Sequence, residues 1–168
     1  MTLFRLDASI RVDGSHSREI ADIVEREWLG AYPGNPVIHR HLAVDPIPAG
    51  AWATAVGASP VPADQRSPEQ LAATELAAQA VDQLVEADAL LFAVPLYNFG
   101  VSQHFKTWFD LAYTDPRIDP SGTALRGKPA QWQAAARDFP WVETSKGAVL
   151  ENIQKQPDVL AFTSPLWH

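Results

Sequence analysis

The feature that most constrains the fold is a continuous apolar run in the middle of the chain, Ala-Leu-Leu-Phe-Ala-Val from Ala89 to Val94. An unbroken run of this length is typical of a strand buried on both faces of a parallel sheet, because a strand with one wet face alternates apolar and polar residues. The run therefore predicts an α/β chain in which helices cover both faces of the sheet.

Two more strands are predicted before this run. Residues 3–8 form a short, largely apolar stretch, and residues 37–42 alternate in the manner of a strand with one less buried face. Between them, a helix is expected from about Ser17, because apolar residues recur on one helical face. These residues are Ile20, Ile23, Val24 and Trp28. Consecutive strand–helix–strand units imply right-handed crossovers and a doubly wound sheet.

Two further helices are predicted. Ser67-Pro68-Glu69-Gln70 combines an N-cap, a proline in the first turn and a glutamine three residues after the cap, so a helix should run from there to about Glu86. Residues 45–66 are expected to form a long surface loop. Residues 95–101 are also expected to be a loop, after which Ser102 caps a helix. The residues of that helix expected to point inward are Phe105, Trp108, Phe109 and Ala112.

Composition narrows the class of protein. The 168 residues, of which 46% are hydrophobic, suit one globular unit. A formal net charge of −7 argues against nucleic acid as a partner, because nucleic-acid-binding proteins usually carry a basic face. The lack of cysteine excludes disulfides, thiolate nucleophiles and Cys-ligated metals. No secretion signal and no apolar run near the ~18 residues of a membrane span are found, so we expect a soluble, cytoplasmic protein without a membrane partner.

Two loops are expected at the carboxyl edge of the sheet, where open parallel sheets bind their ligands. The first, after residues 3–8, carries hydroxyl groups around Gly14 and leads into a helix N-terminus, which suits a phosphate group. Its candidate phosphate-binding residues are Ser9, Ser15, His16 and Ser17, with Arg11 as a possible charged contact. The alternative is that the serines only cap the helix. Because Gly-x-Gly-x-x-Gly is absent, a dinucleotide on this turn is disfavoured.

The second loop, residues 95–102, combines aromatic rings, an amide and a glycine. Aromatic faces can stack on a flat ligand, the Asn98 amide both donates and accepts, and Gly100 lets the backbone approach closely. A flavin ring needs stacking area and donors near the atoms whose charge changes on reduction. The alternative is that these aromatic residues are ordinary core packing.

The segment from Pro95 to Asp110 contains a recognisable motif, Pro-Leu-Tyr-Asn-Phe-Gly followed by Ser102, Phe105-Lys106 and Trp108-Phe109-Asp110. It resembles the flavin loop and following helix of the FMN-dependent NADH azoreductase and quinone reductase family. Asp7-Ala8-Ser9 with Ser15-His16-Ser17 is similar to the phosphate loop of that family. Residues 45–48 and 127–130 are similar to its segments after the second strand and before the fourth, so the resemblance covers about residues 3–130.

The resemblance implies a flavodoxin-like fold with strand order 2-1-3, followed by a fourth and a fifth strand if they are present. It implies that Ser9, Ser15, His16 and Ser17 line the phosphate and ribityl end of FMN. The residues implied to run along the isoalloxazine ring are Pro95, Leu96, Tyr97, Asn98 and Phe99. It further implies a homodimer that takes hydride from NADH or NADPH and reduces quinones or azo compounds. No catalytic side chain is implied, because the cofactor carries the chemistry.

The resemblance ends at Ala130. Where the family has a buried fourth strand and a Ser-Arg-Gly-Gly-like loop, this chain reads Gln-Trp-Gln-Ala-Ala-Ala-Arg from Gln131, which shows no apolar strand. We therefore divide the chain into a flavodoxin-like FMN-binding domain, residues 1–130, and a C-terminal segment, residues 131–168. The segment is either a divergent tail with a helix over residues 144–154 or the product of a frameshift. In another frame, codons for residues 131–135 permit Val-Ala-Ser-Arg-Gly.

Other candidate sites in the sequence are weaker. His39 and His41 share a face of a predicted strand, but no third ligand is near in sequence, so no metal site is expected. Asp110, Asp115 and Asp119 are interpreted as helix-end and turn residues rather than as an acid–base pair. Two alternative functions stay open: a flavodoxin-like FMN-binding or interaction protein without turnover, and an electron carrier that a protein partner reduces.

Overall fold

The computed structural model describes residues 1–98, 100–118, 123–125 and 130–135. Several predictions concern residues outside these ranges: the flavin contact of Phe99, the turn at Asp119, the segment 127–129 and the helix over residues 144–154. Within the described ranges, no helix is both long and apolar enough to cross a membrane.

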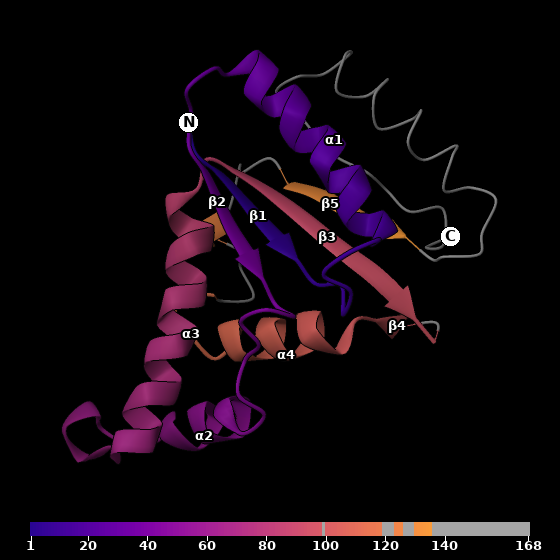
Figure 1. The fold of residues 1–168 in the computed structure, drawn as a ribbon. Coiled ribbons are helices and arrows are strands. Elements are labelled where there is room, and N and C mark those ends of the chain that lie inside the picture. The colour runs from indigo at the N-terminus through magenta and orange to yellow at the C-terminus, as the bar shows by residue number, and fades with distance from the viewer. Residues whose placement is uncertain (99, 119–122, 126–129, 136–168) are drawn as a thin grey trace.

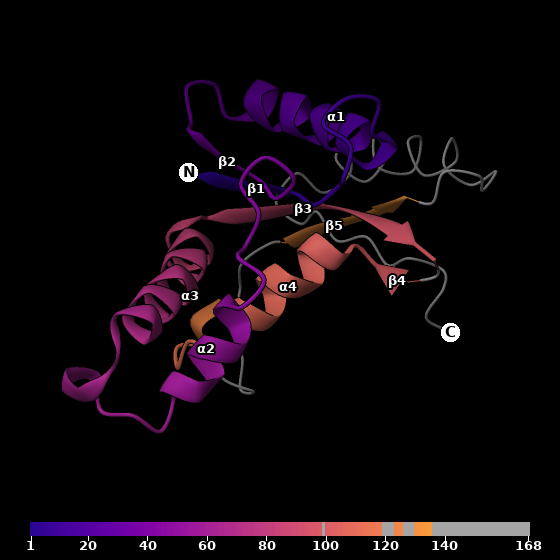
Figure 2. The same cartoon turned by 60° about the horizontal axis from the view of Figure 1, so that its bottom comes forward.

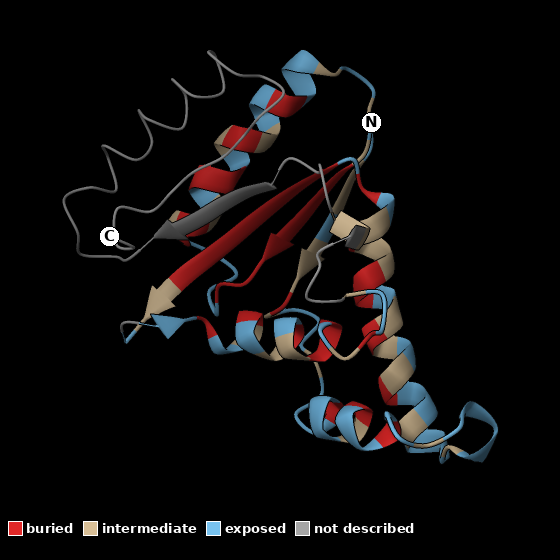
Figure 3. Cartoon of the chain, turned by 180° about the vertical axis from the view of Figure 1, so that it is seen from behind, coloured by how far each residue is buried: buried red, intermediate tan, exposed pale blue. Residues whose placement is uncertain are grey.

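A mostly parallel sheet forms the centre of the fold (Figure 1). β1 (Leu3–Asp7) lies between β2 (Val37–His41) and β3 (Ala89–Tyr97), and β5 (Ala130–Ala135) pairs with β3. All of these pairings are parallel, and the order β2-β1-β3-β5 confirms the predicted doubly wound sheet. Figure 3 shows β1 and most of β3 buried, which confirms the interpretation of the apolar run.

The strand β5 corrects the expectation that no strand follows Ala130. Its backbone pairs with β3 from Leu90 opposite Ala130 to Pro95 opposite Ala135. The sequence pattern misses this strand because strand formation depends on context more than on intrinsic preference. The edge of the buried strand β3 offers a row of backbone N–H and C=O groups. These groups can pair with an adjacent extended segment even when the side chains of that segment lack an apolar pattern.

Each face of the sheet has its own core, because successive side chains of a strand point to opposite faces. On one face, Leu3 and Leu91 pack against α1 (His16–Ala31). The helix residues buried there are Ile20, Val24 and Trp28, as predicted, whereas Ile23 is half-buried. On the other face, Phe4 and Phe92 pack against α3 (Pro68–Glu86) and α4 (Gln103–Ala112). Figure 2 shows α1 on one side of the sheet and α3 and α4 on the other.

α3 begins at the predicted N-cap. Ser67 Oγ accepts the N–H of Gln70 over 3.2 Å, and the Gln70 side chain accepts the N–H of Ser67 over 3.0 Å. This capping box satisfies two backbone donors at the start of the helix. The helix ends at Glu86, as the sequence predicted.

A short helix corrects the predicted surface loop over residues 45–66. α2 (Ala51–Ala58) and the 3-10 turn η1 (Ala63–Gln65) lie within this segment. Ala51 and Ala55 are buried against α3 and against Leu111 of α4. The contact surface of α2 consists of alanines, so it gives little of the large apolar periodicity by which helices are recognised in sequence. Packing rather than helix propensity stabilises a helix this short.

The chain after the apolar run is a hairpin rather than the predicted loop. β3 continues through Pro95 to Tyr97, and Asn98 leads into β4 (Gly100–Val101), which pairs antiparallel with the end of β3. Asn98 has a φ of 50°, a left-handed conformation that asparagine tolerates better than most residues. We call residues 95–98, at the end of β3, together with β4 the tyrosine hairpin.

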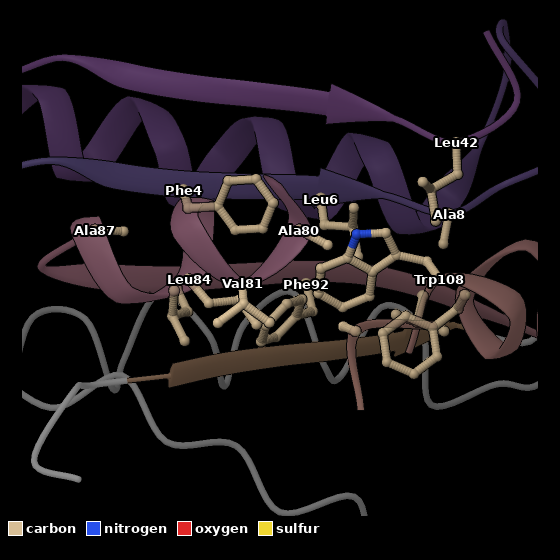
Figure 4. Close-up of a cluster of buried hydrophobic side chains, with 14 residues drawn as sticks. Phe4, Leu6, Ala8, Leu42, Ala80, Val81, Leu84, Ala87, Phe92 and Trp108 are labelled. Atoms are coloured by element: carbon tan, nitrogen blue, oxygen red, sulfur yellow. The ribbon is translucent and has the colours of Figure 1, made fainter. Parts of the chain in front are cut away.

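α4 confirms the predicted cap and most of the predicted inward face. Ser102 Oγ accepts the N–H of Phe105 over 3.2 Å. Of the predicted inward residues, Phe105, Trp108 and Ala112 are buried, as is Leu111, and Figure 4 shows the indole of Trp108 among the core side chains. Phe109 is 44% exposed, which corrects its predicted inward position. It follows Trp108 by one residue, about 100° around the helix, and it stacks on Phe105 and Tyr113 instead. The 3-10 turn η2 (Thr123–Leu125) follows α4 in the chain.

Candidate functional site

The carboxyl ends of β1 and β3 bring the two candidate loops together. The N–H of Ala8 donates to the Ala93 carbonyl over 3.0 Å, so the strand pairing continues past β1. Ser102 hydrogen-bonds to the chain at both strand ends. Its buried Oγ donates to the Ala8 carbonyl over 2.6 Å, and its N–H donates to the Pro95 carbonyl over 3.1 Å. The sequence identified Ser102 only as a cap, because a contact between residues so far apart leaves no local pattern.

A direct contact joins Ser9 and Tyr97, one predicted residue from each loop. Their hydroxyl oxygens lie 3.2 Å apart and share a hydrogen bond. The Tyr97 oxygen also accepts the N–H of Ile10 over 3.2 Å, and Ser9 Oγ accepts the N–H of Arg11 over 3.1 Å. We call residues 9–15 the serine loop. The hydroxyl of Tyr97 therefore lies against the serine loop, while its backbone belongs to the tyrosine hairpin.

Ser15 and Ser17 place two buried hydroxyls at the start of α1. Their Oγ atoms lie 3.2 Å apart, and the two residues are 6% and 2% exposed. Ser15 precedes the helix, yet its side chain makes no capping hydrogen bond among the described residues. Capping alone therefore does not account for this serine. The arrangement offers hydroxyls and first-turn backbone N–H groups at the positive end of the helix dipole, which suits an anion.

The other residues of this region are more exposed. The side chain of His16 is 43% exposed, and its Nδ1 lies 3.3 Å from Oε2 of Glu19. Arg11 is exposed. Gly14 has a φ of 61°, where a side chain would strain the backbone, so this glycine is needed for the turn of the serine loop.

The four predicted ring-binding residues that the structure describes, Pro95 to Asn98, lie along the tyrosine hairpin. Pro95 is buried, Leu96 and Tyr97 are half-buried, and Asn98 is exposed. Exposure therefore increases along the hairpin next to the serine loop, from a buried proline to an exposed asparagine amide.

A buried charge cluster lies between β1 and α1, and the sequence analysis did not identify it. The Arg5 side chain is 3% exposed and lies 3.1 Å from Asp7, 2.7 Å from Asp22 and 2.7 Å from Glu25. Burial alone would lower the pKa of Arg5, but the charge of Asp7 and the hydrogen bonds with Glu25 and Asp22 outweigh it and raise the pKa. The available signal was an Arg and an Asp two residues apart, hence on one face of an apolar strand.

The two histidines of β2 have different partners. His39 Nε2 lies 3.2 Å from Oε1 of Glu25, and His41 Nδ1 accepts the N–H of Ala43 over 3.2 Å. Across the residues that the structure describes, His, Asp and Glu side chains form no group of three or more that could hold a metal ion.

His41 should make stability depend on pH. Burial lowers the pKa of His41, and the positive charge of Arg18 lowers it further. The folded protein then takes up this proton less readily than the unfolded chain. The contribution of His41 to the free energy of unfolding should therefore be constant above about pH 6.5, should fall as the pH drops from there toward the lower folded-state pKa, and should level off below that pKa.

The variant His41→Asn tests this expectation, since the Asn side chain keeps an acceptor for the Ala43 N–H and removes the titrating ring. Urea denaturation between about pH 7.5 and 5 should show a shallower loss of stability in the variant. Parallel pH profiles for the two proteins would mean that His41 has no part in the acid sensitivity.

Comparisons with known proteins extend these observations. The model of one protein family, described by its flavodoxin-like fold, matches residues 1–167. The chain is 39% identical over 127 residues to the FMN-dependent NADH:quinone oxidoreductase of Xanthobacter autotrophicus, over 75% of this chain and 61% of that protein. The chain thus spans less than two thirds of the length of this relative.

Solved structures show the same fold. The azoreductase AzrA superposes with a TM-score of 0.69 at 15% identity, over 92% of this chain and 98% of that one. An FMN-dependent NADH-azoreductase from Bacillus anthracis, in complex with FMN, superposes with a TM-score of 0.62 at 14% identity, over 95% and 83% of the two chains. The family model matches residues 1–167 and so continues past Ala130, where the resemblance read from the sequence ended. This chain therefore belongs to the family with the flavodoxin-like fold.

Proposed function

We propose that the chain is an FMN-dependent oxidoreductase that takes hydride from NADH or NADPH and passes the electrons to a quinone or an azo compound. The observation that carries this proposal is the contact between Ser9 and Tyr97, which joins the serine loop to the tyrosine hairpin at the carboxyl edge of the sheet. The 39% identity to an FMN-dependent NADH:quinone oxidoreductase supports the same assignment.

The phosphate and ribityl end of FMN would be held by the serine loop and the start of α1. The buried hydroxyls of Ser9, Ser15 and Ser17 and the first-turn N–H groups of the helix are neutral donors, and such a set fits a phosphate group. His16, half-exposed, would lie at the outer side of this end.

The isoalloxazine ring would lie along the tyrosine hairpin. The residues proposed to contact it are Pro95, Leu96, Tyr97, Asn98 and Phe99. Bound FMN would supply the redox chemistry, so no side chain is proposed as an acid, a base or a nucleophile. The role of the chain is to bind and orient the ring. The left-handed backbone of Asn98 supports this role, since it keeps the Asn98 amide at the exposed end of the hairpin.

The proposal includes a homodimer in the cytoplasm, where NADH and NADPH are available. Two exposed aromatic side chains at the C-terminal end of α4, the helix that follows the hairpin, support an interface: Phe109 is 44% exposed, and Tyr113, the C-cap of the helix, is 49% exposed. The two rings stack on each other with their centroids 6.0 Å apart.

A second candidate is a flavodoxin-like protein that binds FMN without turnover. The specific observation in its favour is that residues 131–137, Gln-Trp-Gln-Ala-Ala-Ala-Arg, lack the Ser-Arg-Gly-Gly-like loop that the resemblance implies beside the flavin. We propose the same division of the chain as before, into an FMN-binding domain, residues 1–130, and a C-terminal segment that is either divergent or frameshifted.

Sequencing the gene distinguishes a divergent from a frameshifted C-terminal segment, since an unbroken reading frame through codon 130 leaves only the divergent segment.

The visible absorption spectrum of protein reconstituted with FMN, recorded before and after anaerobic NADH, tests the function. We expect stoichiometric flavin that NADH bleaches and that added benzoquinone reoxidises. Retained flavin that NADH does not bleach would favour the second candidate, and failure to retain flavin would contradict both. In Ser17→Ala, loss of a buried hydroxyl should weaken FMN binding about tenfold, whereas Ser59→Ala, an exposed serine at the end of α2, should bind as the wild type does.

A further inference from the structure

Arg18 is a charged residue of the first turn of α1 that the proposed function has not used. Its Nη1 donates to the carbonyl oxygen of Val12, and its Nε lies 4.0 Å from Oδ2 of Asp7. Its own carbonyl accepts from Nη2 of Arg5 over 3.4 Å. Arg18 therefore connects the far side of the serine loop to the helix and to the buried charge cluster of β1.

The serine loop has little apolar packing to hold it. Ile10 is 58% exposed and Val12 is 46% exposed. Polar contacts fix the loop from two sides: Tyr97 accepts the N–H of Ile10 at its start, and Arg18 donates to the carbonyl of Val12 near its end. Between Val12 and Ser15 the chain passes Gly14 in a left-handed conformation, a turn that needs an anchor on each side to keep one shape.

An anchor at Val12 bears on anion binding because a loop that is already ordered loses less conformational entropy when the ligand arrives. The guanidinium of Arg18 is well suited to this task, since its planar group can donate to a carbonyl and face a carboxylate at the same time. The Arg18 side chain is 31% exposed whereas that of Asp7 is 6% exposed, so the attachment at the Asp7 end is to a buried, fixed group.

We propose that Arg18 is a positioning residue that holds the serine loop in the shape that binds a phosphate monoester, and that it thereby sets the preference for phosphorylated over unphosphorylated flavin. The proposal rests on the proposed function for the identity of the ligand. The ordering of the loop by Arg18 does not depend on it.

Dissociation constants for FMN and for riboflavin, which lacks the phosphate, test the preference. In Arg18→Gln, FMN should bind about tenfold more weakly, the effect of losing one charge-assisted hydrogen bond, while riboflavin, which lacks the phosphate, should lose much less affinity. Arg18→Lys should behave like Arg18→Gln, because an ammonium cannot donate to Val12 and face Asp7 with one planar group. The matched control is Arg26→Gln, the same charge change at an exposed residue of the same helix, which should leave both constants unchanged.

Hydrogen exchange of residues 10–14 in the ligand-free protein gives the second measurement. These amides should exchange several-fold faster in both Arg18 variants and at the wild-type rate in Arg26→Gln. Unchanged exchange would overturn the proposal whether or not flavin binds. A ratio of FMN to riboflavin affinity that survives in Arg18→Gln, or that Arg18→Lys fully restores, would overturn it too. A wild-type protein that binds both flavins equally would instead contradict the phosphate site of the proposed function.

Discussion

Replacing Arg5 by methionine is expected to lower the free energy of unfolding by about 3–5 kcal/mol. The Arg5 side chain is 3% exposed and Asp7 beside it is 6% exposed, so the substitution would leave a buried carboxylate whose remaining cationic neighbour, Nε of Arg18, lies 4.0 Å away. Glu25, 17% exposed, would lose a partner at 2.7 Å as well. Urea denaturation of the purified protein near neutral pH, followed by circular dichroism, measures the change.

Two further variants locate the source of this loss. Arg5→Met combined with Asp7→Leu removes the stranded charge together with its partner, and it should recover most of the stability, since a buried ion pair often exchanges for apolar residues at little net cost. Lys106→Met removes a cation that is 60% exposed and pairs with Asp110 on the surface of α4, and it should cost no more than about 1 kcal/mol. Equal losses in Arg5→Met and Lys106→Met would contradict the assignment of Arg5 as a buried cation.

Truncating Trp108 to alanine is expected to cost about 3–5 kcal/mol of unfolding free energy. The side chain is 2% exposed and lies between the sheet and α4, with its ring centroid 6.4 Å from Phe4, 6.1 Å from Phe92 and 6.0 Å from Phe105 (Figure 4). Its removal would open a cavity in a core shared by β1, β3 and α4. Urea denaturation curves of wild type and variant give the difference.

The adjacent aromatic residue is the matched control. Phe109→Ala removes a ring of the same helix that is 44% exposed, so it should cost no more than about 1 kcal/mol. Comparable losses at the two positions would mean that Phe109 is buried as the helical pattern predicted. Trp108→Phe refines the test, because within the described residues the indole N–H is buried without an acceptor. This variant loses volume but also removes a desolvated donor, so its cost should be smaller than that of Trp108→Ala.

For the candidate site, the sequence indicated the two loops but not how they meet. Ser9 and Tyr97 are 88 residues apart and touch because β1 and β3 are neighbours in the sheet. Arg18 and the buried cluster around Arg5 were not found. A charged residue is ordinarily expected at the surface, and only the packing of α1 on β1 shows that Arg5 and Asp7 are buried.

The amino-acid sequence was sufficient wherever the signal lies within a few neighbouring residues. The apolar run of β3, the capping box at Ser67 and the cap at Ser102 each specify their element locally, because the groups that satisfy one another are adjacent in the chain. The parallel, doubly wound arrangement of the first three strands follows from the same local signals and the handedness of crossovers, whereas their order came from the family resemblance.

The tertiary structure was needed wherever a residue's partner is distant. The edge of β3 makes a strand of Ala130–Ala135, and contact with Ala73 and Ala77 of α3 and with Leu111 of α4 makes a helix of Ala51–Ala58. The packing of α4 on the sheet buries Trp108 and leaves the next residue, Phe109, exposed. Backbone pairing and side-chain burial stabilise a segment through its contacts with another segment. The sequence pattern of one segment alone therefore does not determine whether it forms a strand or a helix.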